Sequence, residues 1–236
     1  MSTIIPRWQD SPKRPHTDVI EELLSPANMR IIDVGCGAGQ MTRALTTMGG
    51  EVIGIDPGKR QLERATAAQP AGSEMYIRGI AEALPFDNQS IDIILFFNSF
   101  HHVPHNNFSN AINESNRVLR PGGKLFFSEP IADGPQFELS KLINDETEIR
   151  ALAYQSILSA SKNGFRAISE LIYITESRHE NFESFKSNST SINPARDVIF
   201  EKHNTEIRDR FKTFSTKDQG YFIFNHPIRS NLFERR

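Results

Sequence analysis

The stretch IIDVGCGAG (31–39) places a short apolar run directly before three alternating glycines. A second apolar run, VIGI (52–55), follows it and ends at Asp56. Glycine permits positive φ and lets a ligand lie against the backbone. The helix expected from Gln40 would turn its free N–H groups toward an anionic group. Strand, glycine loop, helix, strand and acid in this order are typical of half of a nucleotide-binding α/β sheet. We expect Asp56 to bind the two hydroxyls of a ribose.

The glycine spacing differs from that of a dinucleotide site. Such a site has the pattern GxGxxG, whose third glycine allows the helix to pack closely. In this chain Gln40 occupies the position of that third glycine, and the pattern is GxGxG preceded by Asp33. The spacing therefore disfavours an NAD-type oxidoreductase, which stays an alternative.

Composition restricts the class of protein. The chain has 236 residues, of which 38% are hydrophobic, and its formal net charge is -2. One α/β domain of roughly 200–250 residues is an ordinary size, and the near-neutral charge argues against a nucleic-acid face. The single cysteine, Cys36, excludes an internal disulfide. No apolar run approaches the length of a membrane helix, and the first residues do not resemble a signal peptide. We therefore expect a cytoplasmic protein that does not bind a membrane.

The pattern of expected elements predicts an α/β fold. In the first half, expected strands alternate with helices, which indicates a doubly wound, mostly parallel sheet. The strands are expected at 30–34, 51–55, 75–78, 90–97 and 124–128, and the helices at 40–48, 57–68 and 108–119. The second half predicts one long helix, a sixth strand, a broken helical segment and a last strand, at 138–163, 170–175, 182–214 and 220–232.

We expect one domain over residues 1–236. Its cofactor-binding core would span about 17–130, and acceptor or lid elements would occupy about 1–16 and 131–215. The helical insertion at 180–215 is a candidate lid, because its polar stretch 186–194 would bury little apolar surface.

Four motifs extend the pattern along the chain. They read IIDVGCGAG (31–39), VIGIDPGKRQLERA (52–65), RGIAEALPFDNQSIDIILFFNSFHHV (78–103) and NRVLRPGGKLFFSEP (116–130). Their order and spacing resemble the class I S-adenosylmethionine-dependent methyltransferases, in the small-molecule branch that includes the ubiquinone- and menaquinone-biosynthesis enzymes. The resemblance implies S-adenosyl-L-methionine as the cofactor and a Rossmann-like sheet of seven strands, the last antiparallel. Residues 131–236 resemble nothing that identifies a substrate.

The resemblance also implies roles for single residues. The three glycines would line the methionine and ribose of the cofactor, with Asp33 ordering their loop, and Asn98 would face the methionine end. Pro57, Gly58 and Gln61 would border the adenine, and Ala81 and Glu82 follow the third strand, where a backbone N–H typically meets the adenine. The family often has an acid at position 80, where this chain has Ile80, so backbone groups or Glu82 would read the adenine. The predicted cofactor-binding residues are Asp33, Gly35, Cys36, Gly37, Gly39, Gln40, Asp56, Pro57, Gln61, Ile80, Ala81, Glu82 and Asn98.

Three histidines, His101, His102 and His105, follow the strand at 90–97. This is the carboxyl edge, where ligands bind in such sheets. A hydroxyl acceptor needs a base, and histidine suits that role near neutral pH. His101 and His102 are our catalytic candidates; the alternative is that His102 packs at the cofactor and that His105 is solvated. We predict no metal site, because the neighbours His101 and His102 are expected to point apart.

The sequence thus predicts methyl transfer from S-adenosylmethionine to an O, N or C atom of an unidentified small molecule. A cofactor-binding partner protein without transfer activity is a second alternative, but the complete set of binding groups weighs against it. The residues after the fourth strand, Asn98-Ser99-Phe100-His101, lack the Asn/Asp-Pro-Pro-aromatic signature of enzymes that methylate amino groups of DNA bases. We therefore expect no nucleic-acid acceptor, and the oligomeric state stays open.

Overall fold

The computed structural model describes residues 8–236 of the chain. These residues divide into two compact units. The larger unit comprises residues 14–129, 149–171 and 229–236, and the smaller unit comprises residues 8–13, 130–148 and 172–228. Residues 1–7 of the expected N-terminal acceptor element lie outside the described part of the chain. The expectation of one domain over the whole chain stays a prediction.

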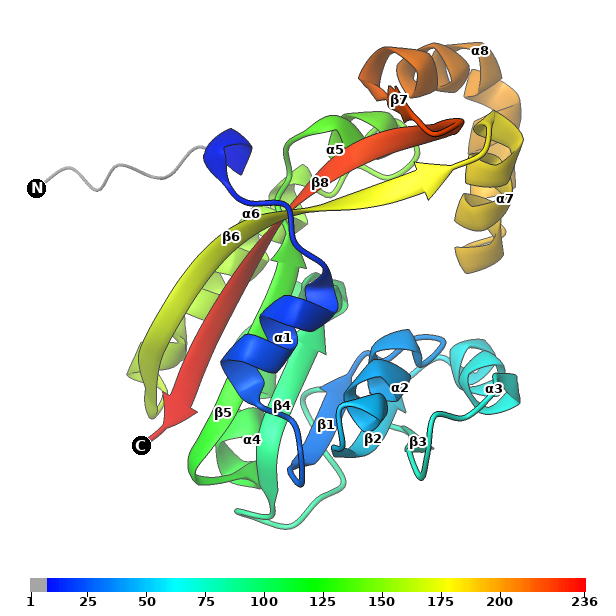
Figure 1. Cartoon of the computed structure of the whole chain (residues 1–236). Coiled ribbons are helices and arrows are strands. Elements are labelled where there is room, and N and C mark those ends of the chain that lie inside the picture. Colours follow the sequence, from blue (N-terminus) through cyan, green and yellow to red (C-terminus); the bar gives the residue numbers. More distant parts are fainter. Residues whose placement is uncertain (1–7) are drawn as a thin grey trace, which may run out of the picture. The chain divides into compact units, whose positions relative to one another are not determined.

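The larger unit is built on a mostly parallel sheet with the order β3-β2-β1-β4-β5-β8-β6. β1 pairs in parallel with β2 and β4, β2 pairs in parallel with β3, and β4 with β5. In Figure 1 the arrow of β8 runs opposite to those of β4 and β5, as the resemblance implied for the last strand. The strands of this path are β1 (Arg30–Val34), β2 (Glu51–Asp56), β3 (Met75–Arg78), β4 (Ile91–Phe97), β5 (Leu119–Pro130), β6 (Phe165–His179) and β8 (Tyr221–Arg235).

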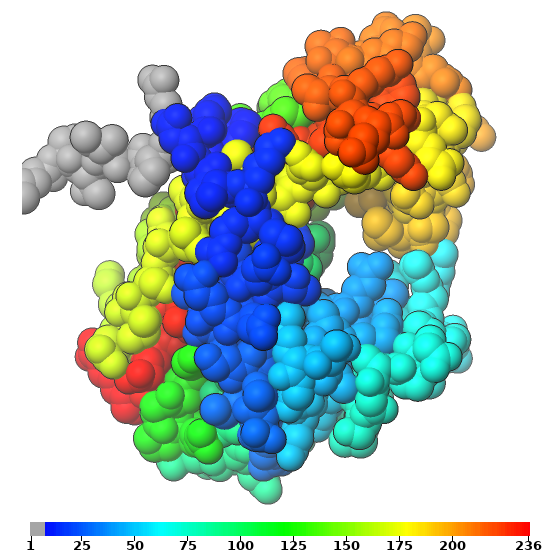
Figure 2. Space-filling model, in the orientation of Figure 1, coloured from blue at the N-terminus to red at the C-terminus, as the bar shows by residue number. Residues whose placement is uncertain are grey.

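Apolar side chains of the central strands alternate between the two faces of this sheet and form an apolar cluster on each face. Ile31 and Leu95 belong to one apolar cluster, and Ile32 and Phe96 belong to the other. Successive side chains of a strand point to opposite faces, so the near-continuous apolar run of β4 serves both clusters, as in a central parallel strand. The helices of this unit are α1 (His16–Leu24), α2 (Gln40–Thr47), α3 (Lys59–Ala67), α4 (Phe108–Val118) and most of α6 (Thr147–Leu158). Both α1 and α2 contribute to the cluster of Ile31, and Figure 2 shows them, in shades of blue, covering that face of the larger unit.

The prediction of one helix over 138–163 is wrong. The structure has α5 (Pro135–Ser140), α6 and a 3-10 turn, η4 (Ser159–Lys162), in this region. Asp145 ends the continuity, because its Oδ1 accepts hydrogen bonds from the backbone N–H of Thr147 at 3.0 Å and from its hydroxyl at 2.5 Å. A short polar side chain that binds the backbone two residues ahead favours the start of a new helix.

The smaller unit contains α5, α7 (Phe182–Ile192), α8 (Arg196–Phe214) and the short strand β7 (Thr216–Asp218), together with parts of β6 and β8. β7 forms an antiparallel hairpin with β8 across Gln219 and Gly220, whose φ values are 47° and 85°. Two consecutive positive φ values are typical of a tight hairpin turn. The strand β7 was not predicted from the sequence. The helices share an apolar core that comprises Leu139, Ile143, Phe182, Phe185, Phe200, Ile207, Phe211 and Phe224.

The insertion expected at 180–215 is therefore helical, and its role as a lid stays a prediction. Asn181 and Ser184 form a capping box at the start of α7. The described residues contain no helix that combines the length and the apolar composition needed to cross a bilayer.

Candidate functional site

A cavity of about 490 Å³ lies in the larger unit at the carboxyl ends of β1, β2, β3 and β4. The sheet order reverses between β1 and β4, and in open α/β sheets ligands bind at such a switch point. The volume is in the range of small-molecule sites. Its wall is formed by Val34, Gly35, Asp56, Pro57, Gln61, Gly79, Ile80, Ala81, Glu82, Phe96, Ser99, His102, Val103 and Pro104.

The three glycines of the loop after β1 differ in what surrounds them. All have positive φ, at 74° for Gly35, 55° for Gly37 and 76° for Gly39. A Cβ on Gly35 would lie 2.5 Å from Cβ of Ser99, and one on Gly39 would lie 2.5 Å from the hydroxyl of Tyr76, so packing within the protein requires both glycines. A Cβ on Gly37 would meet no protein atom within 4 Å. Open space beside bare backbone is what a closely bound ligand requires.

Asp56 at the end of β2 connects this loop to the cavity. Its Oδ2 accepts a hydrogen bond from the backbone N–H of Gly37 at 2.9 Å, and its Oδ1 accepts one from Gly58 at 2.7 Å. Only 9% of Asp56 is exposed, and it lies on the cavity wall. Because each carboxylate oxygen has two lone pairs, both can still accept from the hydroxyls of a ribose. The glycine loop and Asp56 therefore fit the nucleoside part of S-adenosylmethionine.

Asp33 supports the loop from inside the core. It is buried, and its Oδ2 accepts a hydrogen bond of 2.7 Å from the hydroxyl of Thr42 in α2. Burial raises the pKa of Asp33 to about 6; the hydrogen bonds from Thr42 oppose this shift, and the charge of Asp56 adds to it. Asp33 does not line the cavity, so its contact with α2 ties the helix to the strand before the loop.

Another part of the wall is formed by the residues predicted to meet the adenine. Pro57, Gln61, Ile80, Ala81 and Glu82 all lie there. Ile80 is 44% exposed. Oε1 of Glu82 accepts a hydrogen bond of 2.8 Å from the side-chain amide of Asn107. This hydrogen bond holds the carboxylate of Glu82 in position through Oε1 and does not involve Oε2.

Several other predicted residues lie outside the cavity wall, namely Gly37, Gly39, Cys36, Gln40 and Asn98. Cys36 is buried, and burial together with the charges of Asp33 and Asp56 raises the pKa of its thiol, which argues against a nucleophilic role. Gln40 is exposed at the start of α2, and Asn98 is exposed with a φ of 53°. The roles assigned to Asp33, Gly35, Cys36, Gly37, Gly39, Gln40, Asp56, Pro57, Gln61, Ile80, Ala81, Glu82 and Asn98 stay predictions.

Sequence reasoning did not single out several wall residues, namely Val34, Gly79, Phe96, Ser99, Val103 and Pro104. A signal existed for some of them: Val34 and Phe96 lie near the carboxyl ends of β1 and β4, which is the edge where ligands bind. Ser99 is buried, and its hydroxyl donates to the carbonyl of Val34 at 2.6 Å, so it joins the ends of these two strands.

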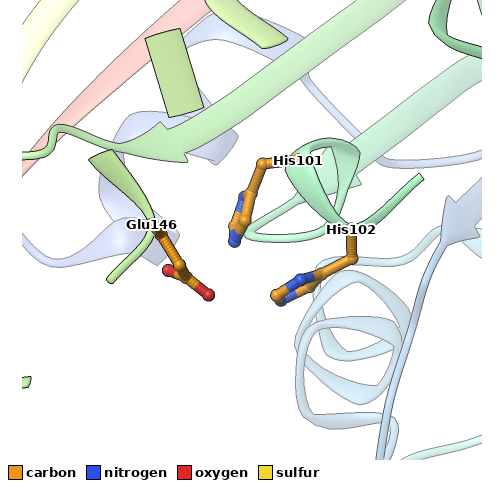
Figure 3. Close-up of side chains that lie close together, drawn as sticks. All are labelled: His101, His102 and Glu146. Carbon is orange, nitrogen blue, oxygen red and sulfur yellow. The ribbon is translucent and has the colours of Figure 1, made fainter. Parts of the chain in front are cut away.

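His101 and His102 lie together, contrary to expectation. Both belong to the 3-10 turn η2 (Phe100–His102), and their ring centroids are 4.0 Å apart. Neighbouring side chains point apart in an extended strand, but the tight 3-10 turn brings these two to the same side. Figure 3 shows the ends of the two rings pointing toward each other. Glu146, also drawn in that figure, belongs to the smaller unit. His102 lines the cavity, and His101 is only 3% exposed.

A buried carboxylate holds His101. Nδ1 of its ring is hydrogen-bonded to Oε2 of Glu129, at the end of β5. Oε1 of Glu129 accepts hydrogen bonds from the backbone N–H groups of Ser99 at 3.0 Å and Phe100 at 2.8 Å. The roles of His101 and His102 in catalysis stay predictions.

Comparison with known proteins shows the family of this chain. Residues 32–127 match the methyltransferase domain family. An uncharacterised methyltransferase of Mycobacterium tuberculosis is 37% identical over 108 residues, which are 46% of this chain and 42% of that protein. The ubiquinone biosynthesis O-methyltransferase of Pseudomonas putida is 34% identical over 158 residues, which are 62% of this chain and 67% of that protein.

A solved structure is similar over most of its length. The YcgJ protein of Bacillus subtilis superposes with a TM-score of 0.61 and 24% identity, covering 94% of this chain and 98% of that one. This likeness shows the fold, whereas the Pseudomonas relative shows the family. The chain therefore belongs to the methyltransferases, the family that its four motifs resemble. It spans less than half the length of the mycobacterial relative that it matches.

Proposed function

We propose that the chain binds S-adenosylmethionine in the cavity of the larger unit and transfers its methyl group to a small-molecule acceptor. The observation that carries this proposal is the Asp56 carboxylate, which lies on the cavity wall while it holds the backbone of Gly37. Family membership and the switch point at β1 and β4 support it. S-adenosylmethionine would supply an electrophilic methyl group on a sulfonium centre.

The residues of the chain would bind and orient the two reactants. Asp56 would accept from the ribose hydroxyls, and the backbone at Gly37 would lie against the cofactor. Phe96, Val103 and Pro104 give the wall apolar surface that excludes water. Holding an acceptor atom about 3 Å from the methyl group can supply several kcal/mol of the barrier reduction. Methyl transfer therefore needs few chemical groups beyond those that position the reactants.

Two alternatives from the sequence make different predictions. An NAD-type oxidoreductase would bind NADH in this cavity, and Gln40, in place of the third glycine, disfavours that. A cofactor-binding partner protein would bind S-adenosylmethionine but would transfer no methyl group.

The proposal is tested with methyl-labelled S-adenosylmethionine and an extract of small metabolites, followed by mass spectrometry of labelled products. We expect a labelled small molecule with the wild-type chain and none with Gly37→Val, whose side chain would fill the space of the cofactor. Absence of any labelled product, with cofactor binding intact, would support the partner-protein alternative instead.

A further inference from the structure

The outer edge of β3 is open to another strand. In the sheet order β3 comes first, and among the described strands only β2 pairs with it. Asp56 lies opposite Arg78 in this pairing, and its carbonyl accepts from the N–H of Gly79 at 3.3 Å. Because the backbone groups of successive strand residues point to opposite sides, the N–H and C=O groups of Tyr76 and Arg78 point away from β2. Outward backbone groups of this kind are a template for pairing with a further strand.

The side chains along this edge are accessible. Met75 is 57% exposed, and Arg78 is also exposed. Glu74, the residue before the strand, is half-buried. Proteins often protect an exposed edge with proline or lysine, and the stretch EMYIR (74–78) contains neither. Its acid and its base lie at equal distances from Tyr76, so the stretch is complementary in charge to its own reverse.

This symmetry selects one antiparallel register between two copies of the chain. With a two-fold axis at Tyr76, the outward backbone groups of the two Tyr76 residues exchange hydrogen bonds. Glu74 of each copy then lies opposite Arg78 of the other, and Met75 lies opposite Ile77 on the second face. A register centred on Glu74 or on Arg78 would instead place like charges opposite each other, which is destabilising. A two-fold contact uses the same patch on both chains, as in most homodimers.

Both charged groups keep capacity for this contact. Oε1 of Glu74 accepts from the N–H of Ala71 and Oε2 accepts from that of Gly72, both at 2.8 Å. Each oxygen has a second lone pair, so the carboxylate can also accept from an arginine. Arg78 uses Nε to donate to the carbonyl of Pro57 at 3.2 Å, a hydrogen bond that does not involve its terminal nitrogens. A guanidinium can bind a carboxylate through two parallel hydrogen bonds.

The groove next to this edge carries charges of both signs. It has a volume of about 570 Å³ and is formed by α3 and the end of β3, with the lining residues Lys59, Leu62, Glu63, Thr66, Ala67 and Arg78. Bases and an acid alternate there, so the groove favours neither a strongly acidic nor a strongly basic partner. Such a surface suits a second copy that presents the same mixed charges.

We propose that the chain forms a two-fold dimer through β3, in which the sheets of two copies join into one continuous sheet. Glu74 and Arg78 form an ion pair on each side of the axis, and Met75 is covered by Ile77 of the second copy. The stretch 74–78 makes a small interface, so the dimer is weak and dissociates on dilution. This inference does not depend on the proposed function.

Sedimentation velocity over a range of chain concentrations measures the association. The wild type should be largely dimeric at about 1 mM chain and should dissociate on dilution, as a small interface does. Arg78→Glu places an acid opposite Glu74 in both pairs and should raise the dissociation constant about tenfold or more. Lys162→Glu, an exposed position with the same change of charge, is the matched control and should dimerise as the wild type does. A wild type that stays monomeric at every concentration would overturn the proposal.

Mixing two variants tests the register. In Arg78→Glu both pairs are acid against acid, and in Glu74→Arg both are base against base. Each variant alone should therefore be monomeric at a concentration at which the wild type is dimeric. A heterodimer of the two variants has an acid opposite a base in both pairs, so dimers should return in an equimolar mixture. No recovery, from two variants that are folded by circular dichroism, would contradict the proposal.

An apolar substitution gives an independent test, because Glu74→Arg also removes the acceptor of two backbone N–H groups. Met75→Lys places a charge opposite Ile77 of the second copy and should weaken the dimer. Ile168→Lys, on β6 at the other end of the sheet and 44% exposed, is its matched control and should not. A dimer that is weakened only by Ile168→Lys, or is unaffected by both Arg78→Glu and Met75→Lys, would place the contact elsewhere and overturn the proposal.

Discussion

Gly37 donates its backbone N–H to Oδ2 of Asp56 at 2.9 Å, so the acid at the end of β2 holds the glycine loop that follows β1. The other oxygen of the carboxylate holds Gly58, just before α3, at 2.7 Å. One side chain thereby fixes two loops and also forms part of the cavity wall. The group proposed to bind the ribose and the backbone proposed to approach the cofactor are thus coupled.

Asp56→Ala should weaken the binding of S-adenosylhomocysteine. The variant loses charge-assisted hydrogen bonds to the ribose and also releases the N–H groups of two loops, for which we expect a loss of about 1–3 kcal/mol in binding free energy. Calorimetry measures this loss directly. Asp87→Ala, at an exposed loop position, is the control and should bind as the wild type does. Wild-type affinity in Asp56→Ala would refute the proposed site.

Gly37→Val should abolish cofactor binding while the fold is retained. Gly122 provides the matched control, because it also has positive φ, at 77°, and a Cβ there would also meet no protein atom within 4 Å. A side chain in this backbone region costs roughly 1–2 kcal/mol, so Gly37→Val and Gly122→Val should lose similar stability. We expect only Gly37→Val to lose affinity for S-adenosylhomocysteine. An equal effect on binding in both variants would mean that strain, and not occupied space, is responsible.

Asp33→Asn should change how stability depends on pH. The folded-state pKa of Asp33, about 6, lies above the ordinary value of 3.8, so the folded state holds this proton more tightly than the unfolded state. The wild type therefore loses stability as pH rises from about 4 to about 6, and the variant would not, because its amide does not titrate. Between about pH 4.5 and about pH 7.5 the stability of the variant relative to the wild type should rise by about 2 kcal/mol. Urea unfolding at several pH values measures this; a constant difference would contradict the assignment.

Ile80 should limit how well the chain recognises the adenine. An apolar side chain cannot accept a hydrogen bond from the exocyclic amino group, and loss of one such bond of about 1 kcal/mol gives discrimination of about tenfold or less against an inosine analogue. Ile80→Asp should sharpen it. Competition calorimetry with the adenosyl and inosyl forms of the demethylated product measures the ratio.

Stronger discrimination would mean that another residue contacts the exocyclic amino group of the adenine. Discrimination far above that value in the wild type would indicate that a side chain already reads the amino group. Glu82 is the candidate, because it lies on the wall and Asn107 fixes one of its oxygens. Glu82→Gln would then reduce the discrimination.

The first half of the fold was predictable from the sequence because apolar runs and short motifs mark its strands and helices. The strand expected at 90–97 is the central strand β4 (Ile91–Phe97), and the glycine loop and Asp56 follow β1 and β2 as expected. The second half was less predictable because contacts distant in sequence decide its elements. The helix expected at 138–163 is interrupted at Asp145, and β7 exists only through its pairing with β8.

Some residues of the candidate site were likewise predictable from the sequence, and others were not. Asp56, Pro57 and Gln61 follow directly from a motif, and all line the cavity. Ser99 and Val103 were missed because they reach the wall through the turn after β4, whose geometry no sequence period describes. The contact between His101 and His102 was mispredicted for the same reason. Glu129 was recognisable as the end of a strand, but its bonds to Ser99 and Phe100 depend on the pairing of β4 with β5.

Binding of S-adenosylmethionine in the cavity is tested by calorimetric titration of the wild-type chain with S-adenosylhomocysteine and, separately, with NADH. We predict a dissociation constant in the micromolar range for S-adenosylhomocysteine and no measurable binding of NADH. Saturation at about 100 times the dissociation constant should also stabilise the fold by about 2.7 kcal/mol. Binding of NADH without binding of S-adenosylhomocysteine would refute the proposed cofactor.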